Sequence, residues 1–336
     1  MSADFGGRFA VIVGGPRCGT TSLARWLGQH PQVCFAVPKE PHFFTIHDFS
    51  GWAESDLRDI TRREYLDRYF PNCDGGQMLA EGSVSYLYAA ERMEPLLKLW
   101  PDAKFIIGVR DPMKMLPSLY QRLLVTGDET AADFDTAWKL VPERREGRQV
   151  PKSCIDPRFL DYESAVQFGT FVERFFESVG RDRCHVVVHD DLYSDPAKVY
   201  RDMLEFLGLE DYGRTDFSAR RSAQGFKFGW LQRLLKRPPV ATRAVLAGEK
   251  YRTRVKAVGK EKKKESRLTG LIMRGRKRLL RWNKAPAKPV TISPEVRRDI
   301  AEKLRGEIDR LGKLLGRDLS HWLSVEPPQK TSSARR

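Results

Sequence analysis

The stretch RFAVIVGGPRCGTTSLARWLGQH, residues 8–30, predicts a strand, a tight turn and a helix in direct succession. Residues 9–13 are an unbroken apolar run rich in β-branched side chains, which is typical of a strand buried on both faces in a parallel sheet. Glycine and proline interrupt the run, and the hydroxyl side chains of residues 20–22 are expected to cap the helix that follows. Apolar side chains recur in this helix at helical spacing, at Leu23, Trp26 and Leu27.

A glycine-rich turn between a strand and a helix is a ready site for an anion. Free backbone N–H groups and the positive end of the helix dipole both point into it. Gly14 and Gly19 have the spacing of a nucleotide-binding P-loop, in which the next residue is a lysine. Thr20 stands there in this chain, and the basic side chain of the turn is Arg17. The turn predicts a phosphate-like ligand, with a plain strand–helix connector as the alternative.

A second candidate element is PKEPHFF, residues 38–44. Its two prolines favour an extended, non-helical path. Glu40 and His42 place a carboxylate and an imidazole two residues apart, a pair suited to acid–base work beside a nucleophile. A surface loop in which Glu40 forms an ion pair is the alternative that the spacing leaves open.

The remaining apolar runs alternate between strand-like and helix-like patterns. Residues 103–109 and 184–188 read as buried strands, residues 31–37 as a short one, and residues 77–88 as a strand running into a helix. Helices are predicted over residues 64–70, 91–100, 116–124, 160–179, 197–207, 230–236, 268–282 and 293–315. Residues 128–150 and 217–229 are expected to be loops. Alternating strands and helices imply right-handed βαβ units, and so an α/β three-layer sandwich around a central parallel sheet.

Arg110 directly follows the predicted strand at residues 103–109, and Ser118 lies on the helix behind it. Ligands of open parallel sheets bind beyond the carboxyl ends of the strands. Arg110, as a forked donor, and Ser118 are therefore predicted to meet an anion. A local ion pair between Arg110 and Asp111 is the alternative.

Composition and cysteine use restrict the class of protein. The 336 residues are 41% hydrophobic and 31% charged, enough for one large α/β domain or two modest ones. No apolar run reaches the length of a membrane span, and the first residues do not resemble a secretory signal. The five cysteines are scattered, so we expect reduced thiols, no metal site and a cytoplasmic protein; they are Cys18, Cys34, Cys73, Cys154 and Cys184.

Positive charge is concentrated in residues 220–288, which hold 23 Lys/Arg and 3 Asp/Glu of the chain's 59 and 44. This segment is expected to be a solvated lid, mobile around residues 260–264, or else a surface that recruits an anionic glycan or a membrane-attached acceptor through residues 268–282. Nucleic acid is not favoured, because the basic runs lack interleaved aromatic residues for stacking. The tail at residues 326–336 is expected to be disordered.

Five sequence blocks together resemble the sulfotransferase family that uses 3′-phosphoadenosine 5′-phosphosulfate (PAPS), above all its bacterial and heparan-sulfate branch. In chain order they are GGPRCGTTSL with a following HP, PKEPHFF, FIIGVRDP with Ser118, HDDLYSDP followed by FLGL, and LLGRDLSHW. The resemblance implies a P-loop NTPase-like sulfotransferase fold. It also implies one domain over residues 1–325, with the basic segment at residues 220–288 as an insertion.

The same resemblance implies roles for single residues. PAPS would be the donor, without a metal, and the acceptor a hydroxyl, with carbohydrate favoured over other hydroxyl-bearing molecules. Glu40 matches the general base and His42 the histidine near it, and Arg17 stands where the family usually has a lysine. Arg17 is therefore predicted to be catalytic as well; arginine keeps the charge but hardly gives up a proton, so it is expected to act by binding more than by proton transfer. The residues that resemble the 5′-phosphosulfate-binding loop are Gly15, Pro16, Arg17, Cys18, Gly19, Thr20 and Thr21.

Arg110 and Ser118 resemble the pair that holds the 3′-phosphate. The stretch that follows residue 219 resembles the late loop of the family that closes over the nucleotide. Its matching residues are Arg220, Arg221, Gly225 and Lys227. Related enzymes often carry a lysine after the glutamate of the block at residues 80–86, where this chain has Gly82. Two other functions stay open from the residues alone: a nucleotide-dependent kinase with an atypical P-loop, and a non-catalytic protein that binds anions or membrane surfaces.

Overall fold

The computed structural model describes residues 5–218, 224–237 and 267–325. They group into two compact units. Unit 1 comprises the described residues within 1–115, 166–220 and 297–336, and unit 2 comprises those within 116–165 and 221–296. Two helices run from one unit into the other, α6 (Pro112–Thr126) and α16 (Pro294–Leu315). The prediction of a single domain over residues 1–325 stays a prediction, and the tail at residues 326–336 lies outside the described residues.

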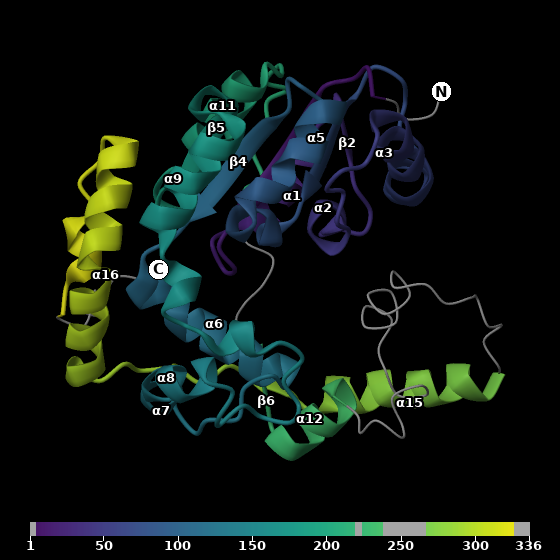
Figure 1. The fold of residues 1–336 in the computed structure, drawn as a ribbon. Helices are drawn as coiled ribbons and strands as arrows, with labels where there is room; N and C mark the ends of the chain where they lie inside the picture. Colours follow the sequence, from purple (N-terminus) through teal and green to yellow (C-terminus); the bar gives the residue numbers. More distant parts are fainter. Residues whose placement is uncertain (1–4, 219–223, 238–266, 326–336) are drawn as a thin grey trace. The chain divides into compact units, whose positions relative to one another are not determined.

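Unit 1 contains a five-stranded parallel sheet in the order β2-β3-β1-β4-β5 (Figure 1). The central strand β1 is buried at every position, as its apolar run predicts. Because all strands are parallel, their carboxyl ends share one edge of the sheet. The strands are β1 (Phe9–Gly14), β2 (Val33–Phe35), β3 (Met78–Gly82), β4 (Lys104–Val109) and β5 (Cys184–Val188).

Helices cover both faces of this sheet, since successive strand residues point to opposite sides. Ala10 and Ile12 of β1 belong to a core that includes apolar residues of α1 (Thr20–Leu27) and α11 (Pro196–Leu207). On the other face, the Phe9 ring stacks on Trp100 at 4.3 Å, directly after α5 (Glu94–Leu99). The Phe105 ring meets Phe175 of α9 (Phe168–Val179) at 5.2 Å. The predicted α/β three-layer sandwich is confirmed.

The starts of two helices, α9 and α1, differ from the prediction. The helix predicted from residue 160 begins at Phe168, after short 3₁₀ turns at Pro157–Leu160 and Ser164–Val166. Hydroxyl capping of α1 is wrong: its N-cap is Gly19, with φ 82°, and no side chain caps it. The other helical segments are α2 (Phe43–Ile46), α3 (Glu54–Thr61), a π-helical turn (Arg62–Leu66), α4 (Asp67–Tyr69), α10 (Asp191–Ser194) and 3₁₀ turns at Val84–Tyr88, Ala90–Met93, Arg181–Arg183 and Ser320–Leu323.

The expectation that all cysteines are reduced is wrong for one pair. Cys34 and Cys73 form a disulfide with a Cα–Cα separation of 5.5 Å, although 39 residues separate them in sequence. The pairing of β2 with β3 brings the two cysteines together, and no local sequence pattern predicts this contact. Cys18, Cys154 and Cys184 are free thiols. Burial raises the pKa of Cys18 and of Cys184 to about 12, so both stay protonated.

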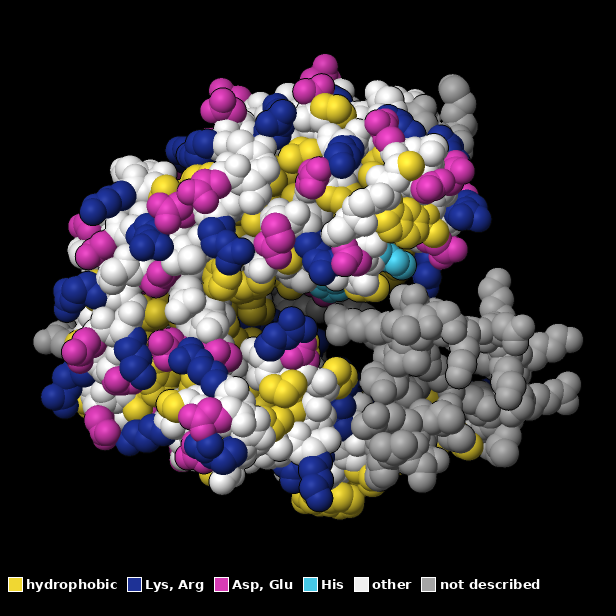
Figure 2. All heavy atoms as spheres, in the orientation of Figure 1, with side chains coloured by type: hydrophobic (Ala, Val, Ile, Leu, Met, Phe, Trp, Pro, Cys, Tyr) yellow, Lys and Arg dark blue, Asp and Glu magenta, His cyan; other side chains and the backbone are white. Residues whose placement is uncertain are grey.

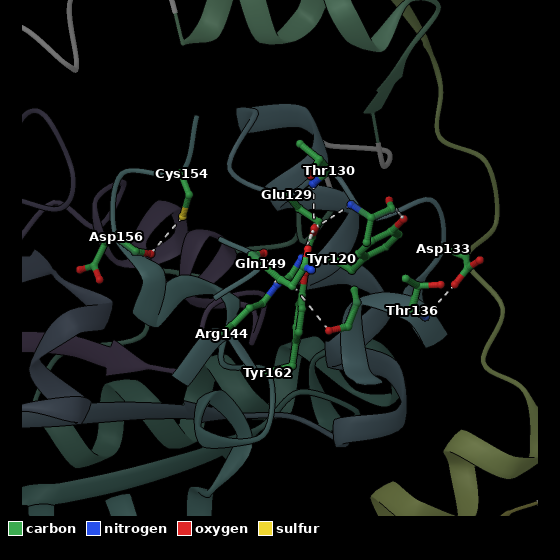
Figure 3. A network of polar contacts seen from close by, with 12 residues as sticks. Tyr120, Glu129, Thr130, Asp133, Thr136, Arg144, Gln149, Cys154, Asp156 and Tyr162 are labelled. Carbon is green, nitrogen blue, oxygen red and sulfur yellow. Dashed lines mark hydrogen bonds and ion pairs between the residues drawn. The ribbon is translucent and has the colours of Figure 1, made fainter. Parts of the chain in front are cut away.

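Unit 2 has more regular structure than its sequence suggests. Two short helices, α7 (Phe134–Lys139) and α8 (Val141–Arg145), replace part of the loop predicted over residues 128–150. Each has less than two turns, too little for a clear apolar period. One local sequence signal for α7 is its capping residue, Asp133. The Asp133 carboxylate accepts a hydrogen bond from the Thr136 N–H at 2.7 Å and so caps the helix (Figure 3).

The second part of unit 2 is an antiparallel ribbon of β6 (Gln224–Phe226) and β7 (Lys284–Pro286). The loop predicted over residues 217–229 is therefore wrong at β6. Helices α12 (Gly229–Lys236) and α15 (Arg267–Trp282) confirm the two short helices predicted there. Buried Asn283 links these elements: it accepts a hydrogen bond from Phe228 N at 2.9 Å and donates one to Phe228 O at 3.1 Å. Residues 260–264, predicted to be mobile, lie outside the described residues.

A buried ion pair holds unit 2 together around Glu129 (Figure 3). Arg144 donates to both carboxylate oxygens of Glu129, at 2.7 and 2.8 Å, and the two side chains are 2% and 0% exposed. Tyr162 donates its hydroxyl to Glu129 at 2.8 Å, and the Thr130 and Ala131 N–H groups donate at 2.7 and 2.8 Å. Every lone-pair direction of the buried carboxylate thus faces a donor, which compensates its desolvation.

Replacing Arg144 with methionine is expected to lower the free energy of unfolding by about 3–5 kcal/mol, because the Glu129 charge stays buried without its partner. Urea denaturation measures the loss. The double variant Arg144→Met/Glu129→Gln is expected to recover part of it. Arg145→Met is the matched control: its ion pair with Asp161 is half exposed, so it is expected to cost about 1 kcal/mol or less. Equal losses for the two single variants would contradict this account.

Candidate functional site

The turn between β1 and α1 lies pressed against the neighbouring strand β4. Gly15 N donates to Gly108 O at 3.1 Å, and a Cβ on Gly14 would lie only 2.4 Å from the same oxygen. Gly14 and Gly19 have φ angles of 138° and 82°, which favour glycine. A Cβ on Gly19 would also meet Leu192 at 2.3 Å. The glycines that suggested an anion loop are therefore required by close contacts as well as by backbone conformation.

Arg17 and Arg110 meet at this turn. The Arg17 backbone is left-handed, with φ 69°, and its carbonyl oxygen accepts a hydrogen bond from Arg110 Nη1 at 2.8 Å. Arg110 Nε is buried and, within the described part of the chain, has no hydrogen-bond partner. A buried donor without a partner is costly and suits an anionic ligand.

The alternative of an Arg110–Asp111 ion pair is not what the structure shows. Asp111 accepts a hydrogen bond from the Met113 N–H at 2.8 Å and lies 3.6 Å from Lys114. Arg110 instead contributes its guanidinium to the loop after β1.

His189, at the end of β5, joins the same cluster. Its ring would be 3.3 Å from a Cβ on Gly19, and its Nδ1 atom is buried without a hydrogen-bond partner among the described residues. Burial, followed by the nearby Arg110 charge, lowers the pKa of His189 to about 4, so the ring is neutral at pH 7. The sequence analysis did not single out His189, although it follows a buried strand just as Arg110 does.

Glu40 and His42 lie on a loop with an unusual backbone. Their φ angles are 67° and 57°. Across the described chain only four residues other than glycine have positive φ, namely Arg17, Glu40, His42 and Gln149. Each such residue costs free energy, and such residues cluster at functional sites. Three of the four are the residues for which the sequence predicts a catalytic role.

The Glu40 carboxylate is held between a cation and an imidazole. Lys39 Nζ lies 2.9 Å from Glu40 Oε1, and His42 Nε2 lies 4.0 Å from Glu40 Oε2. The Glu40 side chain is 33% exposed, so an incoming hydroxyl can reach it. The ion pair that the sequence left open does form, but in a partly buried setting beside His42.

The strand end beneath this loop fixes its position. The His42 N–H donates to Ser83 Oγ at 2.9 Å, and that hydroxyl donates to Glu81 Oε2 at 2.7 Å. His42 Nδ1 is hydrogen-bonded to Ser85 Oγ at 2.7 Å. Burial raises the pKa of Glu81 to about 7, although the hydroxyls of Ser83 and of nearby tyrosines oppose the shift. The loop that carries Glu40 therefore rests on a buried carboxyl group at the end of β3.

Sheet order determines which of these groups are neighbours in unit 1. The loop after β1 lies between the end of β3, which supports Glu40 and His42, and the end of β4, which carries Arg110. His189 follows β5, the next strand. Thr20 is buried against Gly108, whereas Thr21 and Arg17 are exposed. A cationic anion loop is thus flanked by a carboxylate–imidazole pair on one side and a second arginine on the other.

The remaining predicted site residues that the structure describes belong to unit 2. Ser118 lies on the part of α6 that belongs to unit 2. Gly225 is in β6, where a Cβ would meet Pro286 O at 2.8 Å, and Lys227 lies over the Trp282 ring at 5.2 Å. Both have structural contacts in the ribbon, and their roles at a ligand stay predictions. Arg220 and Arg221 lie outside the described residues.

Two features are absent from the described ranges. In residues 5–218, 224–237 and 267–325, no group of three or more His, Cys, Asp or Glu side chains could hold a metal ion. Over the same part of the chain, no helix has the length and apolar character needed to cross a membrane.

The buried carboxyl of Glu81 predicts a pH dependence of stability. Its pKa in the folded protein, about 7, is above the ordinary value of 4.5, so the folded state binds more protons in between. The Glu81 contribution is fully present below about pH 4.5 and is lost as the pH rises through about 7. We expect Glu81→Gln to remove up to roughly 3 kcal/mol of this loss.

Urea denaturation of both proteins at pH 5 and pH 8 measures this difference. At pH 8, the free energy of unfolding of Glu81→Gln is expected to rise relative to that of the natural chain. Glu54→Gln, on the exposed i,i+4 pair with Arg58, is the control and is expected to show no such pH-dependent gain. A constant difference between Glu81→Gln and the natural chain at the two pH values would show that Glu81 does not titrate in this range.

Comparison with known proteins finds a family match over part of the chain. The model of the sulfotransferase family matches residues 54–213, which include Arg110 and His189. Mouse heparan sulfate glucosamine 3-O-sulfotransferase 3B1 is 28% identical over 206 residues, covering 60% of this chain and 46% of that protein. Human bifunctional heparan sulfate N-deacetylase/N-sulfotransferase 3 is 26% identical over 231 residues, covering 67% of this chain and 24% of that protein. The chain spans less than half the length of these curated relatives.

A solved structure shares the fold over nearly the whole chain. The sulfotransferase from Alicyclobacillus acidocaldarius superposes with a TM-score of 0.60 at 22% identity, covering 94% of this chain and 98% of that one. The resemblance inferred from the five sequence blocks is thereby confirmed: residues 54–213 of this chain match the sulfotransferase family, and the curated relatives are, by their names, sulfotransferases.

Proposed function

We propose that this protein transfers a sulfuryl group from PAPS to a hydroxyl group of a carbohydrate acceptor. One observation carries the proposal: the glycine-rich loop with Arg17 lies between Arg110 on one side and the Glu40–His42 pair on the other. Anion binding and proton removal, the two tasks of sulfuryl transfer, thus have residues on opposite flanks of one loop.

The residues of the loop fit the anionic ends of such a donor. Gly14 and Gly19 have no room for a Cβ, so the backbone itself forms the surface of the turn. The first turn of α1 leaves backbone N–H groups without partners inside the helix. Arg110 Nε adds a buried donor without a partner in the described part of the chain. Arg17, Thr20 and Thr21 would hold the phosphosulfate, and Arg110 the 3′-phosphate; a part of Ser118 in holding it stays a prediction.

Bound PAPS supplies the activated sulfuryl group. In the transfer, the acceptor oxygen forms a bond to sulfur while the bond from sulfur to the phosphate oxygen breaks. Glu40 accepts the proton of the acceptor hydroxyl, a contribution that is typically worth about 10²–10⁴-fold. Negative charge grows on the departing phosphate oxygen, and the Arg17 guanidinium with the loop N–H groups stabilises it. His42, anchored on Ser85, keeps an imidazole beside Glu40.

A carbohydrate acceptor is proposed because the relatives named above act, by their names, on heparan sulfate. Helix α15 is consistent with an anionic acceptor: it carries six Lys/Arg and no acidic residue, and its side chains at Arg274, Lys277, Arg278 and Arg281 are exposed. On the face shown in Figure 2, basic and acidic side chains are interspersed over the rest of the described surface. Contact with a membrane surface and a cytoplasmic location stay predictions.

The kinase alternative is less well supported. Thr20 occupies the position at which a P-loop carries the lysine that reaches the β- and γ-phosphates. No second observation favours nucleoside triphosphate chemistry, and the family match favours sulfotransfer. A non-catalytic binding role would leave the strained backbone at Glu40 and His42 without a reason.

Thermal unfolding with ligands distinguishes these functions. A ligand that binds only the folded state raises Tm, and a concentration of 100 times Kd adds about 2.7 kcal/mol. We expect 3′-phosphoadenosine 5′-phosphate to raise Tm by several degrees and ATP with Mg²⁺ to raise it less. Arg110→Ala should reduce the shift, whereas Arg58→Ala, an exposed control, should not. A shift with ATP and Mg²⁺ alone would favour the kinase.

Replacing Glu40 with glutamine tests the proposed base. We expect kcat for transfer from radiolabelled PAPS to heparan sulfate to fall by about 10²–10⁴-fold, with nearly unchanged binding of 3′-phosphoadenosine 5′-phosphate. Glutamine keeps the shape of the side chain but accepts no proton. A neutral polysaccharide serves as the acceptor control. Full activity of Glu40→Gln would exclude Glu40 as the base.

A further inference from the structure

Gly82 ends strand β3, and the space above it is filled by another residue. A Cβ on Gly82 would lie 3.0 Å from Lys39 Cε and 3.6 Å from both Ile12 Cβ and Ile12 O. Gly82 is not among the glycines with positive φ, so its backbone conformation does not require glycine. Room for the aliphatic stem of Lys39 is what this position provides.

The stem leads the Lys39 ammonium to the reacting edge of the sheet. Gly82 pairs with Ile12 of β1, two residues before the glycine-rich loop begins. Lys39 Nζ lies 2.9 Å from Glu40 Oε1, and the Lys39 side chain is only 22% exposed. The ammonium therefore lies at the carboxyl end of β3, beside the neighbouring strand that leads into the anion loop.

Contacts around Glu40 give its two oxygens different partners. Oε1 faces Lys39, and Oε2 is the oxygen nearer to His42, at 4.0 Å. The other carboxyl group close to Lys39 is Glu81, whose pKa the Lys39 charge lowers slightly against the larger effect of burial. Lys39, His42 and Glu81 are thus three titratable groups that lie close together here. Lys39 contributes the ammonium group among them.

We propose that Lys39 is a positioning residue of the transfer site, which orients Glu40 and keeps it ionised, and that Gly82 is the specificity-determining position that admits Lys39. The inference rests on the proposed function. Its chemistry is direct: an ammonium at hydrogen-bond distance favours the carboxylate form and fixes one oxygen, so the other stays directed to the acceptor hydroxyl.

On this account, Gly82 is required for the position of Lys39, and the site still has a cation. A side chain there and the Lys39 stem would compete for one volume. The cation reaches the site from the loop before α2 instead of from the strand end.

Two single variants and their combination test the proposal. Lys39→Met keeps the aliphatic stem and removes the charge. Gly82→Ala adds one methyl group, which displaces the flexible Lys39 stem by a few tenths of an ångström and needs no backbone change. We expect each to lower kcat for transfer to heparan sulfate by about 10–100-fold, with unchanged KM for PAPS. In Lys39→Met, the acid limb of the kcat–pH profile should move to higher pH, because Glu40 loses its cation.

The combined variant separates a specific effect from a general one. If Gly82→Ala acts through Lys39, it should have little further effect on kcat in the Lys39→Met background. Tm and binding of 3′-phosphoadenosine 5′-phosphate, measured for every variant, identify any loss of fold. Should Lys39→Met not fold, Lys39→Gln takes its place. Lys98→Met, on an exposed i,i+4 pair with Glu94, is the matched control.

The outcomes distinguish this inference from the function on which it rests. No transfer by the natural chain would overturn the proposed function. Transfer by the natural chain, with kcat and the pH profile unchanged in Lys39→Met, would overturn the role of Lys39. Losses that multiply in the combined variant would overturn the link between Gly82 and Lys39.

Discussion

The close approach of the β1–α1 turn to strand β4 is the constraint on which the site depends. A side chain on Gly14 would collide with the Gly108 carbonyl, and one on Gly108 would lie 2.8 Å from Cys18 O. Backbone therefore packs on backbone, and the turn is held against the sheet by the hydrogen bond from Gly15 to Gly108. Because the turn is fixed there, the Arg17 carbonyl accepts a hydrogen bond from the Arg110 guanidinium, which brings a cationic side chain from the end of β4 to the anion loop.

Strained backbone conformations at this site are compensated by hydrogen bonds to neighbouring residues. Arg17, Glu40 and His42 adopt left-handed conformations that side chains disfavour. The hydrogen bonds from His42 to Ser83 and Ser85 offset part of that cost and tie the loop to the end of β3. Such over-determination is how a strained loop persists in a folded protein. In return, the site has a carboxylate and an imidazole whose geometry is set before any ligand binds.

Charge at the site is arranged by burial as much as by pairing. His189 and Glu81 are both buried, and burial favours the neutral form of each: it lowers the pKa of the histidine and raises that of the carboxylic acid. Arg17, by contrast, is exposed, while Glu40 and Lys39 are partly exposed and form an ion pair. The charged groups are thus the more exposed ones, and burial favours the neutral forms of His189 and Glu81 beneath them.

The elements that depend on local sequence pattern could be predicted before the structure was known. The apolar run of β1, its glycines and the periodicity of α1 predicted the strand–loop–helix, and Arg110 followed from its place at a strand end. Four features became visible only in the tertiary structure. They are the Cys34–Cys73 disulfide, the β6–β7 ribbon, the position of His189 beside the anion loop, and the packing of the Lys39 side chain over Gly82. Each joins segments far apart in the chain or depends on burial among them. Periodicity and turn chemistry report only on neighbours in sequence, whereas these contacts exist only once the sheet has aligned its strand ends.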